Sequence, residues 1–227
     1  MPTAMVTGAN RGIGLEFARQ YAADGWRVIA TCRNPDGADD LKSLPGDVTI
    51  QAMDVGDPAS IRAARKAIGD APIDALINNA GLLGGREQDF GKTDYDTMAE
   101  VLRVNVIGPL AVAEAFVGNL EAGEGKRLAT VSSRIGSIGE NGSGGRYIYR
   151  PSKAGVNAVM KSVALDLAGR GIHVAILHPG HVRTDMGGPK APVSPEDSVR
   201  GMRAVIDGLT LETSGQFFNY DGTEIAW

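Results

Sequence analysis

The sequence is poor in the residues that build disulfide frameworks and metal centres. It contains one cysteine, Cys32, so no disulfide can form within the chain. Among its three histidines, His178 and His181 lie three positions apart, but a proline and a glycine separate them. They do not combine with Cys32 in a recognised zinc spacing. We therefore expect no metal site.

The sequence also lacks a strong excess of charge and a long apolar run. Its formal net charge is -4 and its isoelectric point is near 5.4, and its positive residues are scattered rather than clustered. This pattern is not typical of a nucleic-acid-binding protein. The N-terminus shows no secretory signal pattern, and no apolar stretch approaches the ~18 residues that span a bilayer. We expect a soluble, cytoplasmic protein with no nucleic-acid or membrane partner.

The chain has 227 residues, of which 43% are hydrophobic, enough for one large domain over residues 1–227 with a sizeable core. Two small domains are less favoured. Predicted strands cover residues 4–6, 26–31, 47–53, 74–77, 128–132, 174–177 and 215–219. One predicted helix directly follows the first strand, and four others cover residues 58–68, 94–120, 148–168 and 195–208. This alternation predicts an α/β fold, a doubly wound (Rossmann) seven-stranded parallel sheet with helices on both faces. Its ligand site should line the carboxyl ends of the strands.

A glycine cluster follows the first predicted strand, at its junction with the first helix. Gly8, Gly12 and Gly14 have a spacing that differs from the usual G-x-G-x-x-G dinucleotide pattern. Glycines let the backbone approach a pyrophosphate closely, and a helix N-terminus supplies free amides and a partial positive charge. The position of the glycine cluster therefore favours a nucleotide-binding turn over a simple connection.

The end of the second predicted strand indicates which nucleotide is bound. An acidic residue there would hold the ribose 2′-hydroxyl of NAD, but the sequence has Cys32 followed by Arg33. An arginine can pair with a 2′-phosphate instead, and Arg11 in the glycine turn could converge on the same group. NADP(H) is therefore favoured over NAD(H). The alternative is that both arginines are simply solvated.

Three further polar features each admit two interpretations. Asp54, after the third strand, could face an adenine edge or cap the turn that follows it. Residues 78–81, Asn-Asn-Ala-Gly, would let the backbone pass close beneath a cofactor, although Asn-rich turns are common. Asn105 lies inside the predicted helix 94–120, where an asparagine is slightly unfavourable unless its amide has a specific role. A solvated amide is the alternative.

Tyr149 and Lys153 are the strongest candidates for chemistry. In the predicted helix 148–168 they stand at positions i and i+4, on one face and within reach of each other. A phenol normally loses its proton near pH ~10, and a nearby ammonium should lower that pKa toward neutrality, where proton transfer is most useful. Pro151 fits the first turn of such a helix. The alternative is a surface pair, or a packed ring beside a snorkelling lysine.

These motifs, in this order, resemble the short-chain dehydrogenase/reductase family over nearly the whole chain. They are residues 7–14, residues 78–81, Asn105, Ser132 with Ser133, Tyr149 with Lys153, and Pro179 with Gly180. The glycine-rich loop 139–146, the run 149–153 and the ending 215–222 are similar to the C-factor and Sniffer-type carbonyl reductase branch.

The resemblance implies a catalytic tetrad. Tyr149 would give a proton to the substrate carbonyl oxygen while hydride leaves the cofactor for the carbonyl carbon. Lys153 would lower the pKa of the tyrosine and bind the nicotinamide ribose. Asn105 would hold a water of the proton relay, and a serine would hydrogen-bond the carbonyl oxygen.

The tetrad requires a choice of tyrosine and of serine. Tyr147 has Pro151 four residues after it, so only Tyr149 has a lysine at the required spacing. The family pattern favours Ser133 as the serine. The usual gap to the tyrosine is shorter than in this chain, and Ser137 lies nearer that gap. We attribute the difference to extra residues in the glycine-rich loop.

The resemblance also implies a set of cofactor contacts at the strand ends. It assigns the pyrophosphate and phosphate end to the glycine turn and the 2′-phosphate to Arg33. The residues expected to bind NADP(H) are Gly8, Arg11, Gly12, Ile13, Gly14, Arg33, Asp54, Val55, Asn79, Ala80, Gly81, Tyr149, Lys153, Pro179, Gly180, Val182 and Thr184.

By the same resemblance, the protein is expected to be an NADPH-dependent reductase of small-molecule aldehydes or ketones that forms a homodimer or homotetramer. The alternatives are an NAD-dependent alcohol dehydrogenase, or a C-factor-like signalling protein that uses its nucleotide structurally. Residues 186–193 form a short Gly/Pro-rich link where many relatives have a substantial lid. This link suggests an open pocket that admits varied carbonyls.

Overall fold

The computed structural model describes residues 1–227 and contains one seven-stranded sheet in which every neighbouring pair is parallel. The strand order is β3-β2-β1-β4-β5-β6-β7. The strands are β1 (Thr3–Thr7), β2 (Arg27–Cys32), β3 (Val48–Ala52), β4 (Ala75–Asn78), β5 (Arg127–Val131), β6 (His173–His178) and β7 (Phe217–Asn219). The predicted fold class is confirmed.

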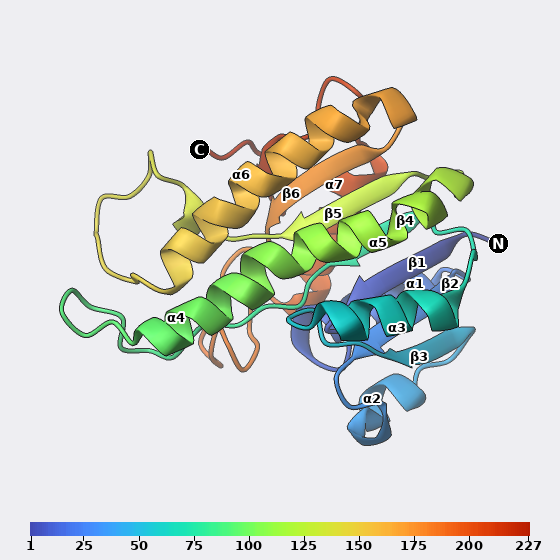
Figure 1. Ribbon diagram of the computed structural model, residues 1–227, viewed down its shortest axis with the longest axis horizontal. Helices are drawn as coiled ribbons and strands as arrows, with labels where there is room; N and C mark the ends of the chain where they lie inside the picture. Colours follow the sequence, from blue (N-terminus) through green and yellow to red (C-terminus); the bar gives the residue numbers. More distant parts are fainter.

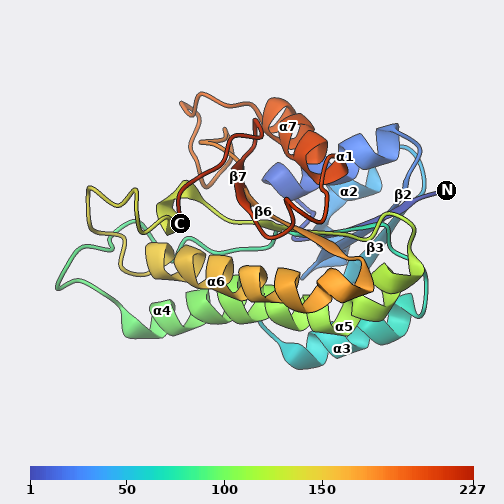
Figure 2. The same ribbon diagram turned by 90° about the horizontal axis from the view of Figure 1, so that it is seen from above.

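Helices cover both faces of this sheet, so the molecule has three layers (Figures 1 and 2). One face carries α3 (Pro58–Ile68), α4 (Tyr95–Leu102), α5 (Gly108–Ala122) and α6 (Tyr149–Leu167), and the other carries α1 (Gly12–Ala23) and α7 (Pro195–Asp207). A 3-10 turn at Pro35–Gly37 and the short α2 (Asp39–Lys42) follow β2. The sequence did not predict these two short elements, because neither is long enough to show a helical period.

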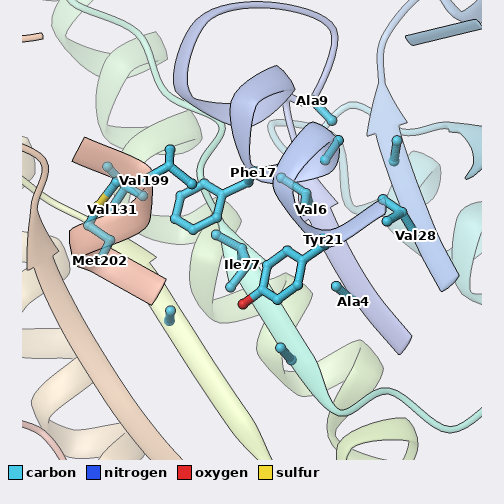
Figure 3. Packing of buried hydrophobic residues seen from close by; sticks show 14 of the residues in the cluster. Ala4, Val6, Ala9, Phe17, Tyr21, Val28, Ile77, Val131, Val199 and Met202 are labelled. Atoms are coloured by element: carbon cyan, nitrogen blue, oxygen red, sulfur yellow. The ribbon is translucent and has the colours of Figure 1, made fainter. Parts of the chain in front are cut away.

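The core is divided by the sheet into two clusters, because successive side chains of a strand point to opposite faces. In β1, Ala4 and Val6 belong to the cluster beneath α1 and α7, whereas Met5 belongs to the cluster beneath α5 and α6. Phe17 and Tyr21 of α1 are the largest fully buried side chains in the first cluster (Figure 3). Burial of a ring such as that of Phe17 contributes roughly 2–3 kcal/mol.

The predicted helix 94–120 is present as one helical run, Tyr95–Ala122, but it is not α-helical throughout. It starts after Asp94, whose Oδ1 accepts from the amides of Asp96 and Thr97 at 3.0 and 3.2 Å. After α4 the backbone adopts a π-helical segment, Arg103–Ile107, before α5 begins. Single π-helical turns inside an α-helix often occur at functional sites, and this one contains Asn105.

The combined helical run Tyr95–Ala122 is apolar enough to meet the length and composition test for a membrane span, with a mean hydropathy of 1.5 over 18 residues. The expectation that no stretch approaches this length was therefore wrong. The inward side of the run packs Val112, Phe116 and Leu120 into the core. Because buried core helices pass the same test, this finding is weak evidence for a membrane span.

The connections that follow the strands gather at one edge of the sheet. In a parallel sheet all carboxyl ends lie at the same edge, and here the strand order reverses between β1 and β4. Two long loops, residues 79–94 before α4 and residues 132–148 before α6, extend past this edge at the left of Figure 1. The fold thus brings every predicted site segment to one place.

Candidate active site

The glycine turn is packed so tightly that its glycines cannot carry side chains. Gly8 has a φ of +62°, and a Cβ on it would lie 2.9 Å from Ala80 Cα. A Cβ on Gly14 would lie 2.3 Å from the carbonyl oxygen of Gly8. The close contact between the β1 and β4 connections therefore requires glycine at both positions.

Helix α1 begins with its amide groups unprotected by side chains. Its N-cap residue, Arg11, makes no side-chain capping bond, and the amide of Leu15 donates to Arg11 O at 3.2 Å. The preceding amides, those of Gly12, Ile13 and Gly14, point out of the helix end, where a phosphate would be held. The predicted phosphate-binding residues thus have the geometry that an anion site requires.

Arg11 and Arg33, the residues predicted to hold the 2′-phosphate, follow two adjacent strands, since Thr7 of β1 is in register with Thr31 of β2. Arg11 is two-thirds exposed and forms an ion pair with Asp185 at 3.3 Å. Arg33 is exposed and makes no ion pair or side-chain hydrogen bond within the chain. A guanidinium with no carboxylate beside it suits a phosphate better than a ribose hydroxyl.

Asn79 supports the glycine turn rather than facing outward. Its Nδ2 donates to the carbonyl oxygens of Thr7 and Gly8, at 3.0 and 3.2 Å. The amides of Asn79 and Ala80 in turn donate to Thr7 Oγ1, each at 3.0 Å. Both N–H groups of the Asn79 side chain are used, so a cofactor contact there would involve its Oδ1 or the backbone of residues 79–81.

Asp54 caps the turn that follows it, which is one of the two roles that the sequence allowed. Its Oδ1 accepts from the amide of Gly56 at 2.8 Å, and its own amide donates to Ser60 Oγ at 2.9 Å. Val55 is buried in the core against α5, where a Cβ on Gly108 would lie 2.8 Å from Val55 O. Contact of either residue with an adenine stays a prediction.

The segment after β6 reaches back to the glycine turn. A Cβ on Gly12 would lie 3.4 Å from Thr184 Cγ2, so these two sequence motifs are in contact. Pro179 O accepts from Ser198 Oγ at 2.6 Å, which ties the segment to α7. Val182 is buried and forms an isolated parallel bridge with Val193. Residues 179–184, which are expected to bind NADP(H), and the predicted phosphate site therefore form one continuous edge.

Asn105 has a specific structural role and is not solvated. Its exposed fraction is 1%, its Oδ1 accepts from the amide of Leu82, and its Nδ2 donates to Leu82 O, with both distances 2.8 Å. The same Nδ2 donates to Ser152 Oγ at 3.0 Å. Both of its N–H groups are therefore in use, so the side chain has no free donor for a relay water.

Gly81 links the glycine turn to the predicted tetrad. A Cβ at this position would lie 3.3 Å from Asn105 Oδ1 and 3.7 Å from Lys153 Nζ. A larger residue would separate the β4 connection from α6. The glycine thus lets the backbone that underlies the phosphate site pass directly beside the catalytic candidates.

Among the serines, Ser133 is the one beside the tyrosine. Ser133 is close enough to Tyr149 to lower the pKa of the phenol, and Ser133 Oγ accepts from the amide of Ile135 at 3.3 Å. Ser132 is buried and donates to Asn157, and Ser137 Oγ accepts from the amide of Glu140 at 3.1 Å. The structure therefore brings Ser133, the preferred candidate, to the tyrosine.

The predicted acidification of Tyr149 is absent from this structure. Burial raises the pKa of the phenol to about 12, although the hydrogen bond from Ser133 and the charge of Arg146 act against this rise. Lys153 Nζ donates to Val131 O at 2.9 Å and lies 5.6 Å from the centre of the Tyr149 ring. Burial also lowers the pKa of Lys153 to about 8. The expectation was wrong because it counted the neighbouring charge and not the loss of water around the phenolate.

The glycine-rich loop before α6 is held by Arg150. Its Nη1 donates to Ile135 O at 3.0 Å, and its Nη2 donates to Gly144 O at 3.1 Å. Arg146 within this loop has a φ of +56°, which is uncommon for a residue with a side chain. Arg150 therefore ties this loop to the start of α6 and to the turn that follows Ser133.

Sequence reasoning missed two residues that contact the tyrosine backbone. Ser152 Oγ donates to Tyr149 O at 2.7 Å, and Gln88 Oε1 accepts from the Tyr149 amide at 2.8 Å. A serine inside the first turn of a helix often bonds back to a carbonyl one turn earlier, so Ser152 had a local signal. Gln88 is 61 residues away from Tyr149 and had none.

A family model described as short chain dehydrogenase matches residues 2–193. The chain is 47% identical over 167 residues to C-signal of Myxococcus xanthus, a match that covers 74% of this chain and 100% of that protein. It is 38% identical over 233 residues to 1-hydroxy-2-glutathionyl-2-methyl-3-butene dehydrogenase of Rhodococcus sp. (strain AD45), and this match covers 100% of both chains.

Two solved structures superpose over the whole chain. The NADPH-bound carbonyl reductase from chicken fatty liver has a TM-score of 0.93 and 35% identity, and the match covers 100% of this chain and 99% of that one. The carbonyl reductase Sniffer of D. melanogaster has a TM-score of 0.92 and 31% identity, and the match covers 100% of both chains.

Proposed function

This chain belongs to the short-chain dehydrogenase/reductase family, and we propose that it reduces aldehyde or ketone carbonyls to alcohols with NADPH. The observation that carries this proposal is a chain of neighbours: Lys153 Nζ lies beside Gly81 and 5.6 Å from the centre of the Tyr149 ring, and Ser133 lies beside Tyr149. Its resemblance to the NADPH-bound carbonyl reductase from chicken fatty liver supports the choice of cofactor and reaction.

The residues fit NADPH, which when bound supplies hydride to the substrate carbonyl carbon. The amides at the start of α1 would hold the pyrophosphate, and Arg33 with Arg11 would hold the 2′-phosphate. Ser133 Oγ would donate a hydrogen bond to the carbonyl oxygen. Tyr149, whose raised pKa keeps it protonated at neutral pH, would give that oxygen its proton.

Consumption of NADPH with a panel of aldehydes and ketones tests the reaction. Tyr149→Phe removes only the hydroxyl and should lower kcat roughly 10²–10⁴-fold. Tyr147→Phe is the matched control, because this nearby ring is partly exposed and has no lysine four residues on, and it should retain activity. Normal turnover by Tyr149→Phe would remove the tyrosine from the mechanism.

Two relatives favour alternative functions, which the wild-type protein and the Tyr149→Phe variant can also test. The Rhodococcus relative is a dehydrogenase by name, so alcohol oxidation with NAD is a second candidate, decided by comparing the affinities for NADPH and NADH. The identity with C-signal favours a signalling role that needs no turnover. That role would prevail if Tyr149→Phe kept the full biological effect of the chain while no carbonyl or alcohol was turned over.

Assembly into a homodimer or homotetramer is part of the proposal. The helical run Tyr95–Ala122 and helix α6 would pack against a second subunit, and much of the apolar run is exposed on the single chain. Light scattering should give a mass of two or four chains. A mass equal to one chain would refute this assembly.

A further inference from the structure

Helix α6, which carries Tyr149, begins without a local cap. Its N-cap residue, Ile148, is itself in the helical region and makes no side-chain capping bond. None of the four preceding residues, 144–147, has a short side-chain oxygen that could accept from the first amides. The amides of the first turn therefore need an acceptor from elsewhere in the fold.

Gln88, from the loop between β4 and α4, supplies that acceptor. Its Oε1 accepts from the amides of Ile148 at 3.2 Å and Tyr149 at 2.8 Å. The next amide, that of Arg150, donates to Arg146 O at 2.9 Å, and Pro151 has no N–H. Every amide of the first turn is thus accounted for, and the one that belongs to Tyr149 depends on Gln88.

Gln88 is itself fixed in one orientation. Its exposed fraction is 2%, and its Nε2 donates to Leu83 O and Gly85 O, both at 2.8 Å. Its backbone oxygen accepts from the amide of Tyr147 at 3.1 Å. Because its side-chain donors face carbonyls and its acceptor faces amides, rotation of the amide group by half a turn would break all four side-chain bonds.

The same loop also holds the carbonyl group of Tyr149. Ser152 Oγ donates to Tyr149 O, and Asn105 Nδ2 donates to Ser152 Oγ. Asn105 is bonded in both directions to the backbone of Leu82. The loop of residues 82–88 therefore fixes the N–H of Tyr149 through Gln88 and its C=O through Ser152.

We propose that Gln88 is a positioning residue for Tyr149: by capping α6 from a neighbouring loop, it sets where the phenol stands beside Ser133. This inference rests on the proposed function, in which Tyr149 is the general acid. Tyr149 is the first residue of α6, so a shift of that end moves the phenol directly. Displacement of a reacting group by about 1 Å can reduce the rate about 10²-fold.

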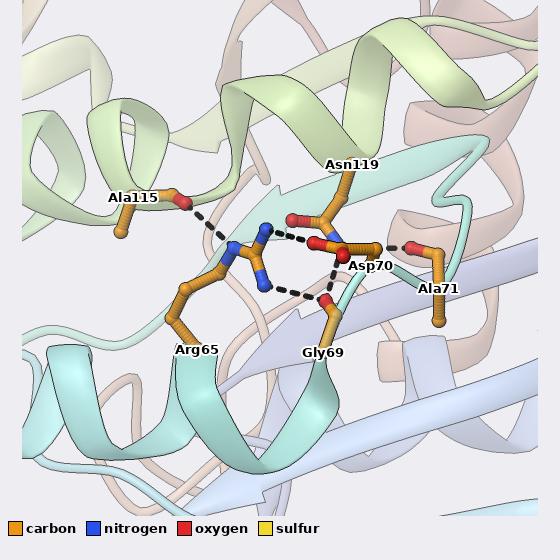
Figure 4. A network of polar contacts seen from close by, with 6 residues as sticks. All are labelled: Arg65, Gly69, Asp70, Ala71, Ala115 and Asn119. Carbon is orange, nitrogen blue, oxygen red and sulfur yellow. Dashed lines mark hydrogen bonds and ion pairs between the residues drawn. The ribbon is translucent and has the colours of Figure 1, made fainter.

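Asn119 provides a matched control for a purely structural role. It is equally buried, and its Nδ2 donates to Gly69 O and Ala71 O, each at 2.8 Å, as Gln88 donates to two loop carbonyls (Figure 4). It lies at the end of α5, near the amino-terminal ends of the strands, whereas Tyr149 lies near their carboxyl ends. Replacement of either amide removes two buried donors, but of the two only Gln88 is hydrogen-bonded to the start of α6.

The experiment compares Gln88→Met with Asn119→Leu, both close in shape to the amides that they replace. Urea denaturation should show that both variants are less stable than the wild type. Gln88→Met should lower kcat about 10–100-fold while KM and the Kd for NADPH stay within about twofold, because the groups proposed to hold the pyrophosphate and the 2′-phosphate lie on other elements. Asn119→Leu should keep kcat within about twofold of the wild type.

Gln88→Asn is the second variant if the methionine protein does not fold. Its amide is one methylene shorter, so it cannot reach the loop carbonyls and the amides of α6 at the same time, and kcat should again fall with KM unchanged. The inference is overturned if a folded Gln88 variant keeps wild-type kcat, or if Asn119→Leu loses as much kcat as Gln88→Met does.

Tyr149→Phe separates failure of this inference from failure of the proposed function. If Tyr149→Phe is inactive and Gln88→Met is fully active, the tyrosine is the acid and the positioning role is wrong. If Tyr149→Phe turns over normally, the proposed mechanism itself is wrong. In the Tyr149→Phe background, Gln88→Met should change the residual rate less than twofold, because no acid remains to be positioned.

Discussion

Alanine in place of Gly14 should destabilise the protein. The added Cβ would lie 2.3 Å from Gly8 O and 2.5 Å from Asn79 Nδ2. Gly8 O is a backbone atom, so it cannot move without opening the glycine turn. Overpacking of this kind costs roughly 1–3 kcal/mol. Displacement of Asn79 from Thr7 O and Gly8 O removes two hydrogen bonds, worth about 1 kcal/mol each.

The same substitution at Gly118 should have the opposite effect. Gly118 is exposed in the middle of α5, and no atom lies within 4 Å of the position that its Cβ would take. Alanine there should stabilise the protein by about 1 kcal/mol through helix propensity alone. Gly14 is also helical and recovers about the same amount, so its expected net loss is about 2–4 kcal/mol.

Urea denaturation followed by circular dichroism measures both effects. The midpoint should fall for Gly14→Ala and rise for Gly118→Ala, with the m-value unchanged in each case. The reasoning is refuted if Gly14→Ala unfolds at the wild-type urea concentration or above it, because the Cβ would then have found room that the structure does not show.

Three further predictions concern charge and capping. The pKa of Lys153 falls from its ordinary 10.5 to about 8 in the folded protein, so the unfolded chain binds more protons between these pH values. The free energy of unfolding should therefore rise from pH 8 to about pH 10, and urea midpoints should show a smaller rise for Lys153→Met. Arg33→Ala should weaken NADPH binding about 10–100-fold in a fluorescence titration and leave NADH binding unchanged, since a charge-assisted bond to a phosphate is worth about 1.5–3 kcal/mol; equal losses for both cofactors would contradict the assignment. Asp57→Ala removes the acceptor for the Ala59 amide at the start of α3 and should cost about 1 kcal/mol in urea denaturation, with no change in kcat.

Much of the fold could be predicted because its signals are local. Helix α3 occupies residues 58–68, as the sequence indicated. Asp57 caps its first turn, Pro58 occupies its first position, and Gly69 ends it with a φ of +67°. Each of these signals lies within one or two residues of the boundary that it sets.

Spacing along the helix pairs Tyr149 with Lys153, and the family resemblance adds Ser133 to these candidates. The pKa of Tyr149 could not be predicted in the same way, because it depends on how deeply the whole fold buries the ring. The π-helical segment around Asn105 satisfies contacts with Leu82 and Ser152 that no local pattern reveals. The cap from Gln88 likewise joins two loops that meet only in the folded chain.

The division of the core by the sheet has a consequence for how the protein tolerates change. The two buried clusters, of 24 and 21 residues, face each other only across the strand backbones. A cavity left by Phe17→Ala cannot be refilled by a side chain from the side of Phe116, so the costs of the two truncations should add. Substitutions can therefore accumulate on one side while the other keeps its packing. Because the hydrogen-bonded sheet separates the two sets of side chains, each set can change its sequence independently of the other.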